Sequence, residues 1–166
     1  MNPDNTIHTE RLFLREITAS DTDFIVDARS DPSVYKYFNY PHKIKVEEHL
    51  TWFNSNYFHD SKRIDYIASM RSDFTPVGIY GIKLISKELF EVSYLTIPKY
   101  QGKGYAKEAV ISIIEKGCQL WNCSTCIATV HKENTASMDF ANRLGFIPDT
   151  TDNNFIVFTK SIVDSK

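Results

Sequence analysis

Residues 91–106 read Glu-Val-Ser-Tyr-Leu-Thr-Ile-Pro-Lys-Tyr-Gln-Gly-Lys-Gly-Tyr-Ala, a β-type run that passes through a glycine loop into a helix-type run. Gly102 and Gly104 allow a tight turn and a close approach of the backbone to a ligand. The first amides of the following helix have no carbonyl partner, and the helix dipole is positive at that end. This order of elements predicts a site for an anion such as phosphate.

The residues on either side fix the place of this loop. Pro98 cannot donate to a ladder and therefore marks the end of the strand. Lys107 stands where a dinucleotide-binding loop needs a small residue, and a nucleotide P-loop would need Ser or Thr after Gly-Lys. From these residues alone, an anion site and a plain strand-to-helix turn both remain open. The helix itself is predicted by a stripe of apolar or small residues at helical spacing: Ala106, Ala109, Val110, Ile113, Ile114, Gly117 and Leu120.

Length and composition limit the class of protein. The chain has 166 residues, 42% of them hydrophobic, which predicts one domain over residues 1–166. A formal net charge of -2 argues against a nucleic-acid binder. We find neither a signal-peptide core nor a run long enough to span a membrane. The sequence therefore predicts a cytoplasmic protein that binds neither nucleic acid nor membrane.

The cysteines agree with a reducing compartment. There are 3 of them, an odd number that suits free thiols. Cys123 and Cys126 have the spacing of half a zinc site, but no second Cys or His pair completes it. We therefore expect structural thiols and no metal site.

The whole pattern predicts an α+β fold. The first helix is expected to open with a capping box from Ser20 to Asp23 and to end before Asp31-Pro32, and the last to end at Gly145. The strands are expected to form one mixed, mostly antiparallel sheet with helices on both faces and one parallel step. Strands are expected at residues 12–17, 64–70, 77–85, 90–97, 125–131 and 155–160, and helices at 20–29, 46–58, 106–120 and 136–144.

Three stretches carry a resemblance to a known family. Residues 101–106 match a loop pattern of Gln or Arg, two residues, Gly, one residue, then Gly or Ala. Residues 9–15, Thr-Glu-Arg-Leu-Phe-Leu-Arg, look like an opening strand, and residues 134–146 look like a last helix. In these stretches the chain resembles the GNAT acyltransferases, and among them the branch that acetylates ribosomal-protein amino termini and related amines. The three stretches span nearly the whole chain in the correct order.

The resemblance implies that acetyl-CoA is the co-substrate. In this family the sheet opens beside the strand that ends at Ile97, the pantetheine arm lies in the gap like an added strand, and the diphosphate rests on the loop amides. Leu95 and Ile97 would offer backbone groups to the pantetheine. For Asn134, capping of the last helix is an equally open role. The implied cofactor-binding residues are Leu95, Thr96, Ile97, Gln101, Gly102, Lys103, Gly104, Tyr105, Ala106 and Asn134.

The resemblance also suggests catalytic residues. An amine attacks only when it is neutral, so a base is useful, and Glu91 matches the carboxylate that serves as base in the ribosomal branch. Many members place a tyrosine where this chain has Ala141; Ser137 matches the serine of the ribosomal branch and is the candidate acid. A surface role for Glu91 and a helix-start role for Ser137 stay open. His131 has no partner nearby in sequence, so we expect a structural role at a strand end.

Taken together, the sequence predicts transfer of the acetyl group of acetyl-CoA to a primary amine by direct attack on the thioester. The acceptor is expected to be a protein amino terminus or a small cationic amine. The alternative, suggested by Ala141, is a non-catalytic acyl-CoA-binding sensor or interaction module. Aromatic residues at 35–40 suit either an acceptor wall or packing of the core or of a dimer, so the protein is expected to be a monomer or a homodimer.

Overall fold

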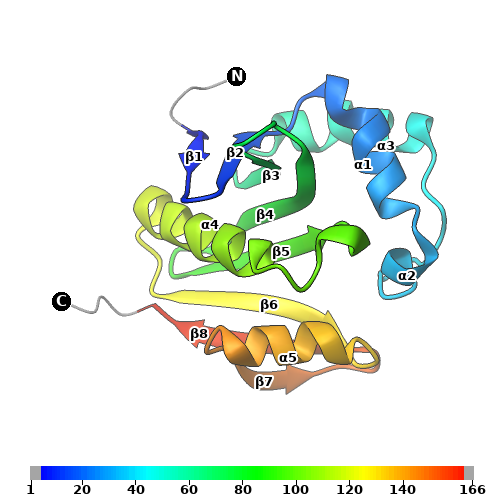
Figure 1. The fold of residues 1–166 in the computed structure, drawn as a ribbon. Coiled ribbons are helices and arrows are strands. Elements are labelled where there is room, and N and C mark those ends of the chain that lie inside the picture. Colours follow the sequence, from blue (N-terminus) through cyan, green and yellow to red (C-terminus); the bar gives the residue numbers. More distant parts are fainter. Residues whose placement is uncertain (1–4, 163–166) are drawn as a thin grey trace.

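The computed structural model describes residues 5–162. Its centre is an eight-stranded sheet in the order β1-β2-β3-β4-β5-β6-β8-β7 (Figure 1). All neighbouring strands are antiparallel except β5 and β6. This confirms the mixed, mostly antiparallel sheet. The strands are Ile7–His8 (β1), Leu12–Glu16 (β2), Arg63–Met70 (β3), Pro76–Ser86 (β4), Leu89–Thr96 (β5), Thr125–His131 (β6), Ile147–Thr151 (β7) and Phe155–Ser161 (β8).

The helices lie on both faces of the sheet, as expected. Within residues 5–162, no helix is both long and apolar enough to cross a membrane. The helices are Thr22–Arg29 (α1), Pro32–Tyr35 (α2), Val46–Ser55 (α3), Tyr105–Trp121 (α4) and Thr135–Arg143 (α5), with short 3-10 turns at Ala19–Asp21, Tyr57–His59 and Pro98–Tyr100.

Side-chain alternation divides the sheet into two faces. Tyr66 and Tyr80 pair across β3 and β4 and belong to the larger core cluster, which includes residues of α4 and α5. We call this the α4 face; α4 and α5 lie in front of the sheet in Figure 1. Ile67 and Ile79 point the other way and pack with residues of α1 and α3, such as Phe53. We call this the α1 face.

The start of the first helix differs from the expected capping box. Asp21, not Asp23, closes the cap: its carboxylate accepts from the Thr18 N–H at 2.7 Å and from the Arg15 guanidinium at 2.8 and 2.6 Å. The expectation at Ser20 was wrong because Arg15 in β2 fixes the capping carboxylate two residues earlier, at Asp21. Burial alone would raise the pKa of Asp21, but the bonds from Arg15 and Thr18 lower it on balance.

Two strands and one α-helix were not predicted. β1 is too short for a periodic signal. β7 reads Ile-Pro-Asp-Thr-Thr and is exposed at every position, so it shows no apolar alternation, and its proline fits an edge strand. Pro32 opens the short helix α2, and Asp31 caps it by accepting from the Ser33 N–H at 2.8 Å. The predicted end of the last helix is confirmed, since Gly145 has φ 82°.

Candidate active site

The sheet opens between β5 and β6. These parallel strands pair only at Leu89 with Thr125, Phe90 with Cys126 and Glu91 with Ile127. β5 then continues to Thr96 and β6 to His131 with no further pairing between them. The opening beside the end of β5 is the one that the sequence resemblance implies. It leaves a strand edge with unpaired backbone groups, to which an extended ligand can add.

The residues that face this opening differ in part from the expectation. The Ile97 N–H donates to the Val77 carbonyl at 2.9 Å, so it points toward β4. Groups alternate in direction along an antiparallel strand, and Leu95 therefore also points toward β4. Tyr94 and Thr96 direct their backbone groups to the opening, where the Thr96 carbonyl already accepts from the Gln101 side chain at 3.1 Å. The contacts from Leu95 and Ile97 to a pantetheine stay a prediction; in this structure their backbone groups point toward β4.

The glycine loop after β5 has the geometry of an anion site. Gly102 has φ 73° and Gly104 has φ 83°, which is left-handed backbone that favours glycine. A Cβ on Gly102 would meet nothing within 4 Å, so its conformation and not crowding requires glycine there. Among residues 5–162, no group accepts a hydrogen bond from the N–H groups of residues 102–106. These donors lie at the positive end of the 17-residue helix α4.

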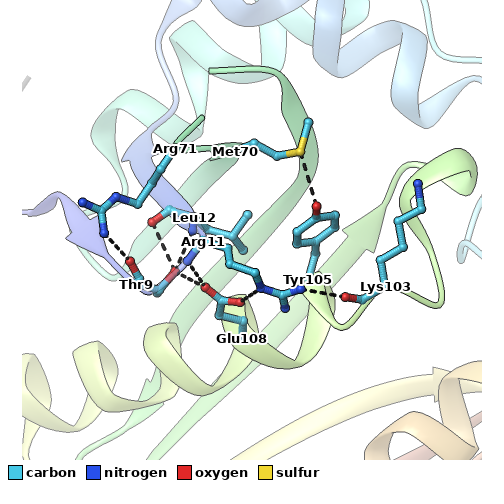
Figure 2. A network of polar contacts seen from close by, with 8 residues as sticks. All are labelled: Thr9, Arg11, Leu12, Met70, Arg71, Lys103, Tyr105 and Glu108. Atoms are coloured by element: carbon cyan, nitrogen blue, oxygen red, sulfur yellow. Dashed lines mark hydrogen bonds and ion pairs between the residues drawn. The ribbon is translucent and has the colours of Figure 1, made fainter. Parts of the chain in front are cut away.

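A polar network joins the loop to the residues just before β2 and to α4 (Figure 2). The Arg11 side chain donates to Glu108 at 2.7 Å and to the Lys103 carbonyl at 2.9 Å, and its guanidinium lies 4.8 Å from the centre of the Tyr105 ring. Glu108 also accepts from the Thr9 hydroxyl. Burial alone would raise the pKa of Glu108, but the bonds from Thr9 and Arg11 lower it on balance. The carboxylate thus stays charged and fixes a guanidinium beside the loop.

Arg11 was missed as a site residue. Its stretch was recognised only as an opening strand, because a contact between residues 11 and 108 has no local signal.

Other loop side chains have structural partners as well. Gln101 donates from its side-chain amide to the Thr96 carbonyl at 3.1 Å, and the Tyr105 hydroxyl meets the Met70 sulfur at 3.4 Å. These contacts join the loop to Thr96 in β5 and the start of α4 to Met70 in β3.

Glu91 lies at the point where the two strands diverge. It is the last residue of β5 that pairs with β6, and it is half-buried. Its carboxylate accepts from the Thr129 hydroxyl at 2.6 Å, across the start of the opening. By strand alternation, Glu91 projects from the α1 face. A carboxylate is thus fixed where a ligand in the opening would end.

Ser137 lies on the α4 face and has a hydroxyl partner. Its oxygen is 2.9 Å from the Tyr94 hydroxyl, and its N–H donates to the Asn134 side chain at 3.1 Å. Burial raises the pKa of Tyr94, and the bond to Ser137 offsets only part of that rise. The phenol therefore stays protonated at neutral pH. Ala141, where many members have tyrosine, is buried in the core.

Tyr94 was the second residue that sequence reasoning missed, because it lies 43 positions from Ser137. Asn134 caps α5, which is one of the two roles left open for it.

His131 packs between the rings of Tyr37 and Phe155, with centroids 5.8 and 5.2 Å away. This matches the expected structural role at a strand end. The contact with Tyr37 also brings the aromatic segment 35–40 to the end of β6, beside the opening.

Comparison with known proteins agrees with this geometry. The family model described as "Acetyltransferase (GNAT) domain" matches residues 11–147. The chain is 31% identical to YnaD of Bacillus subtilis (strain 168), described as an uncharacterized N-acetyltransferase, over 84% of this chain and 81% of that protein. Two similar solved structures show the same fold.

The first is a spermidine N-acetyltransferase from Vibrio cholerae in complex with CoA and spermine, with TM-score 0.80, 17% identity and coverage of 92% of this chain and 96% of that chain. The second is RimL, a ribosomal L7/L12 alpha-N-protein acetyltransferase in complex with coenzyme A, with TM-score 0.79, 14% identity and coverage of 95% and 98%. The open strand edge, the loop amides and the match over most of its length show that this chain belongs to the GNAT acetyltransferases, which transfer the acetyl group of acetyl-CoA to an amine.

Proposed function

We propose that this acetyltransferase acts on a peptide amino terminus or a small primary amine, with Glu91 as the base and Ser137 as the acid. One observation carries the proposal: β5 and β6 stop pairing at Glu91, and unpaired loop amides lie at the other end of the free edge of β5. A coenzyme with its diphosphate on residues 102–106 and its pantetheine along that edge would bring the thioester toward Glu91. The loop fits a diphosphate, since its donors are free and Gly102 has open space beside it.

The first chemical step needs a neutral amine. Amino groups have pKa values of about 7.7 to 10.4, so much of the acceptor arrives protonated at neutral pH. Glu91 would take that proton directly or through a water molecule. The amine then attacks the thioester carbonyl, and a tetrahedral intermediate forms. The Thr129 hydroxyl, 2.6 Å from the carboxylate, supports this role by holding the base in one position.

Collapse of the intermediate expels the coenzyme thiolate. A thiol has a pKa of about 8.5, so the thiolate leaves readily but is helped by a proton donor. Ser137 would donate its hydroxyl proton to the thiolate and recover one from Tyr94, whose hydroxyl is 2.9 Å away. The second proton, which the attacking nitrogen loses as the amide forms, would return to Tyr94 through solvent. This pair would supply the function for which many members use a tyrosine at the position of Ala141. Membership in an acetyltransferase family likewise favours the enzyme over the alternative of a non-catalytic sensor.

The acceptor class rests on the relatives. The ribosomal-protein acetyltransferase among the similar structures supports a protein amino terminus, and the spermidine acetyltransferase supports a small amine. The motif likeness at residues 9–15 and 134–146 favours the ribosomal branch. A cytoplasmic monomer or homodimer remains part of the proposal.

Two measurements test the function. Calorimetry should show binding of acetyl-CoA, and labelled acetyl transfer should occur to at least one member of a panel of peptides and small amines. Glu91→Gln should lower turnover, with the greatest loss at low pH where more of the acceptor is protonated. The matched control is Glu115→Gln on α4, which changes a carboxylate of the other face. A pH–rate profile unchanged by Glu91→Gln would remove Glu91 from the mechanism.

A further inference from the structure

A second polar site lies on the α1 face, away from the loop and from Ser137. It is a cavity of about 410 Å³, within the usual size for small-ligand sites. α1, α3 and the first residue of β3 contribute its walls. Its lining includes Arg29, His49, Trp52 and Arg63, with His42 and Glu48 among the rest.

The cavity contains polar groups without partners. His49 is 1% exposed, and neither ring nitrogen has a hydrogen-bond partner among residues 5–162. Burial and the nearby Arg29 charge lower the pKa of His49, so the ring is neutral and offers one N–H. The Arg29 guanidinium lies over the Phe38 ring at 5.1 Å, and no described residue accepts a hydrogen bond from it. Arg29 is half-buried, but the His49 ring is buried, and a buried N–H is normally satisfied, so a missing acceptor is indicated at His49.

Two arginines and one carboxylate, that of Glu48, line the cavity. Arg63 stacks over Trp52 at 5.0 Å and donates to the buried Asp65 carboxylate at 2.8 Å. That carboxylate lies near both guanidinium groups, but its printed hydrogen bond is to Arg63, so within residues 5–162 no carboxylate is hydrogen-bonded to Arg29. Glu48 is exposed at the rim, where the Lys45 N–H holds its carboxylate at 2.8 Å. A carboxylate or phosphate in the cavity would give the Arg29 guanidinium and the His49 N–H the acceptor that they lack.

The sheet register connects this cavity to Glu91. Arg63 pairs with Lys83 in β4, and Lys83 pairs with Glu91 in β5, so all three residues project from the same face in one row. Two strand spacings separate Arg63 from Glu91, about 10 Å. Lys83 between them is exposed, which leaves that part of the face open to solvent. An extended peptide covers about 10 Å in roughly three residues.

From these observations we propose that the Arg29–His49–Arg63 cavity binds an acidic group of the acceptor, so that the preferred acceptors are peptide amino termini with Asp or Glu at the second or third position. The inference rests on the proposed function, because it names the acceptor for the same reaction. It separates this chain from acetyltransferases whose acceptors are polycations.

The test compares two acceptor peptides that differ in one charge. They are Ala-Ala-Glu-Ala-Ala amide and Ala-Ala-Gln-Ala-Ala amide, with kcat/KM measured for each. A hydrogen-bonded charge predicts about a tenfold or greater preference for the acidic peptide. Arg29→Gln should bring the ratio close to one, whereas Arg29→Lys should keep part of it. Arg143→Gln, the same change on the exposed end of α5, should leave the ratio as in the wild type.

A second measurement does not need turnover. The ring signals of His49 in the NMR spectrum should shift when the acidic peptide is added and not when the glutamine peptide is added. Acetyl transfer with equal kcat/KM for both peptides would overturn the inference and leave the proposed function intact. If transfer failed with every acceptor, the proposed function would fall, and the His49 shift alone would decide on anion binding. Inorganic phosphate that moves the His49 signals while the acidic peptide does not would assign the cavity to a free anion and refute the acceptor role.

Discussion

The hydroxyl pair of Ser137 and Tyr94 gives the sharpest test of the chemistry. The two oxygens are 2.9 Å apart, and the Ser137 N–H is fixed by Asn134 at 3.1 Å. Replacing Ser137 with alanine removes the proposed donor to the thiolate. Replacing Tyr94 with phenylalanine leaves that donor in place but removes its partner. The two changes therefore separate direct donation from support.

The expected magnitudes follow from these roles. A general acid contributes about 10²–10⁴ in rate. Since a thiolate is a fairly good leaving group, we expect the lower end, about a hundredfold loss for Ser137→Ala. Tyr94→Phe removes one hydrogen bond of about 1 kcal/mol, which corresponds to about a fivefold loss. If the tyrosine acts only through the serine, the double variant should lose about a hundredfold; independent roles would give about five hundredfold.

Single-turnover quench experiments with saturating acetyl-CoA measure the chemical step directly. The KM for acetyl-CoA should change little, because neither hydroxyl belongs to the loop. Ser112→Ala is the matched control, since Ser112 is a buried helix serine whose hydroxyl bonds only the Ala109 carbonyl at 2.8 Å. Thermal unfolding checks that each variant is folded. A wild-type rate for Ser137→Ala, or losses that simply multiply in the double variant, would refute the proposed relay.

Three further outcomes are expected. Gly104→Ala should weaken acetyl-CoA binding measured by calorimetry and destabilise the fold by about 1–2 kcal/mol, because its φ of 83° is left-handed and a Cβ would lie 3.1 Å from the Arg11 guanidinium; unchanged affinity would contradict the role of the loop. Gly117→Ala should cost about 1–3 kcal/mol in urea unfolding, since its Cβ would come within 2.8 Å of the Phe90 ring, and a more stable variant would show that the ring can move. The pKa of Asp21 is lower in the folded state than in the unfolded state, so the stabilisation by its carboxylate is present above about pH 4 and is lost as pH falls through the folded-state pKa. The difference in melting temperature between wild type and Asp21→Asn should therefore shrink over that range. A constant difference would refute the linkage.

Local sequence determined most of the secondary structure and the anion loop. Period-2 and period-3.6 patterns predict the central strands and the long helices, because apolar residues at these spacings share one face of the element, and that face is buried whichever element packs against it. Gly102 and Gly104 determine the turn, since glycine adopts left-handed backbone without help from distant contacts. The elements that were missed, such as β7, are exposed edge segments without a buried face to produce a pattern.

The tertiary structure decided which groups meet. The support of the loop by Arg11, the hydroxyl of Tyr94 beside Ser137 and the cavity around His49 each join residues from separate elements. No periodicity records such contacts, because they depend on strand register and on how α1, α3 and α5 pack on the sheet. Register also decided that Thr96 and Tyr94, not Leu95 and Ile97, face the opening: a shift of one residue reverses the direction of every backbone group along a strand.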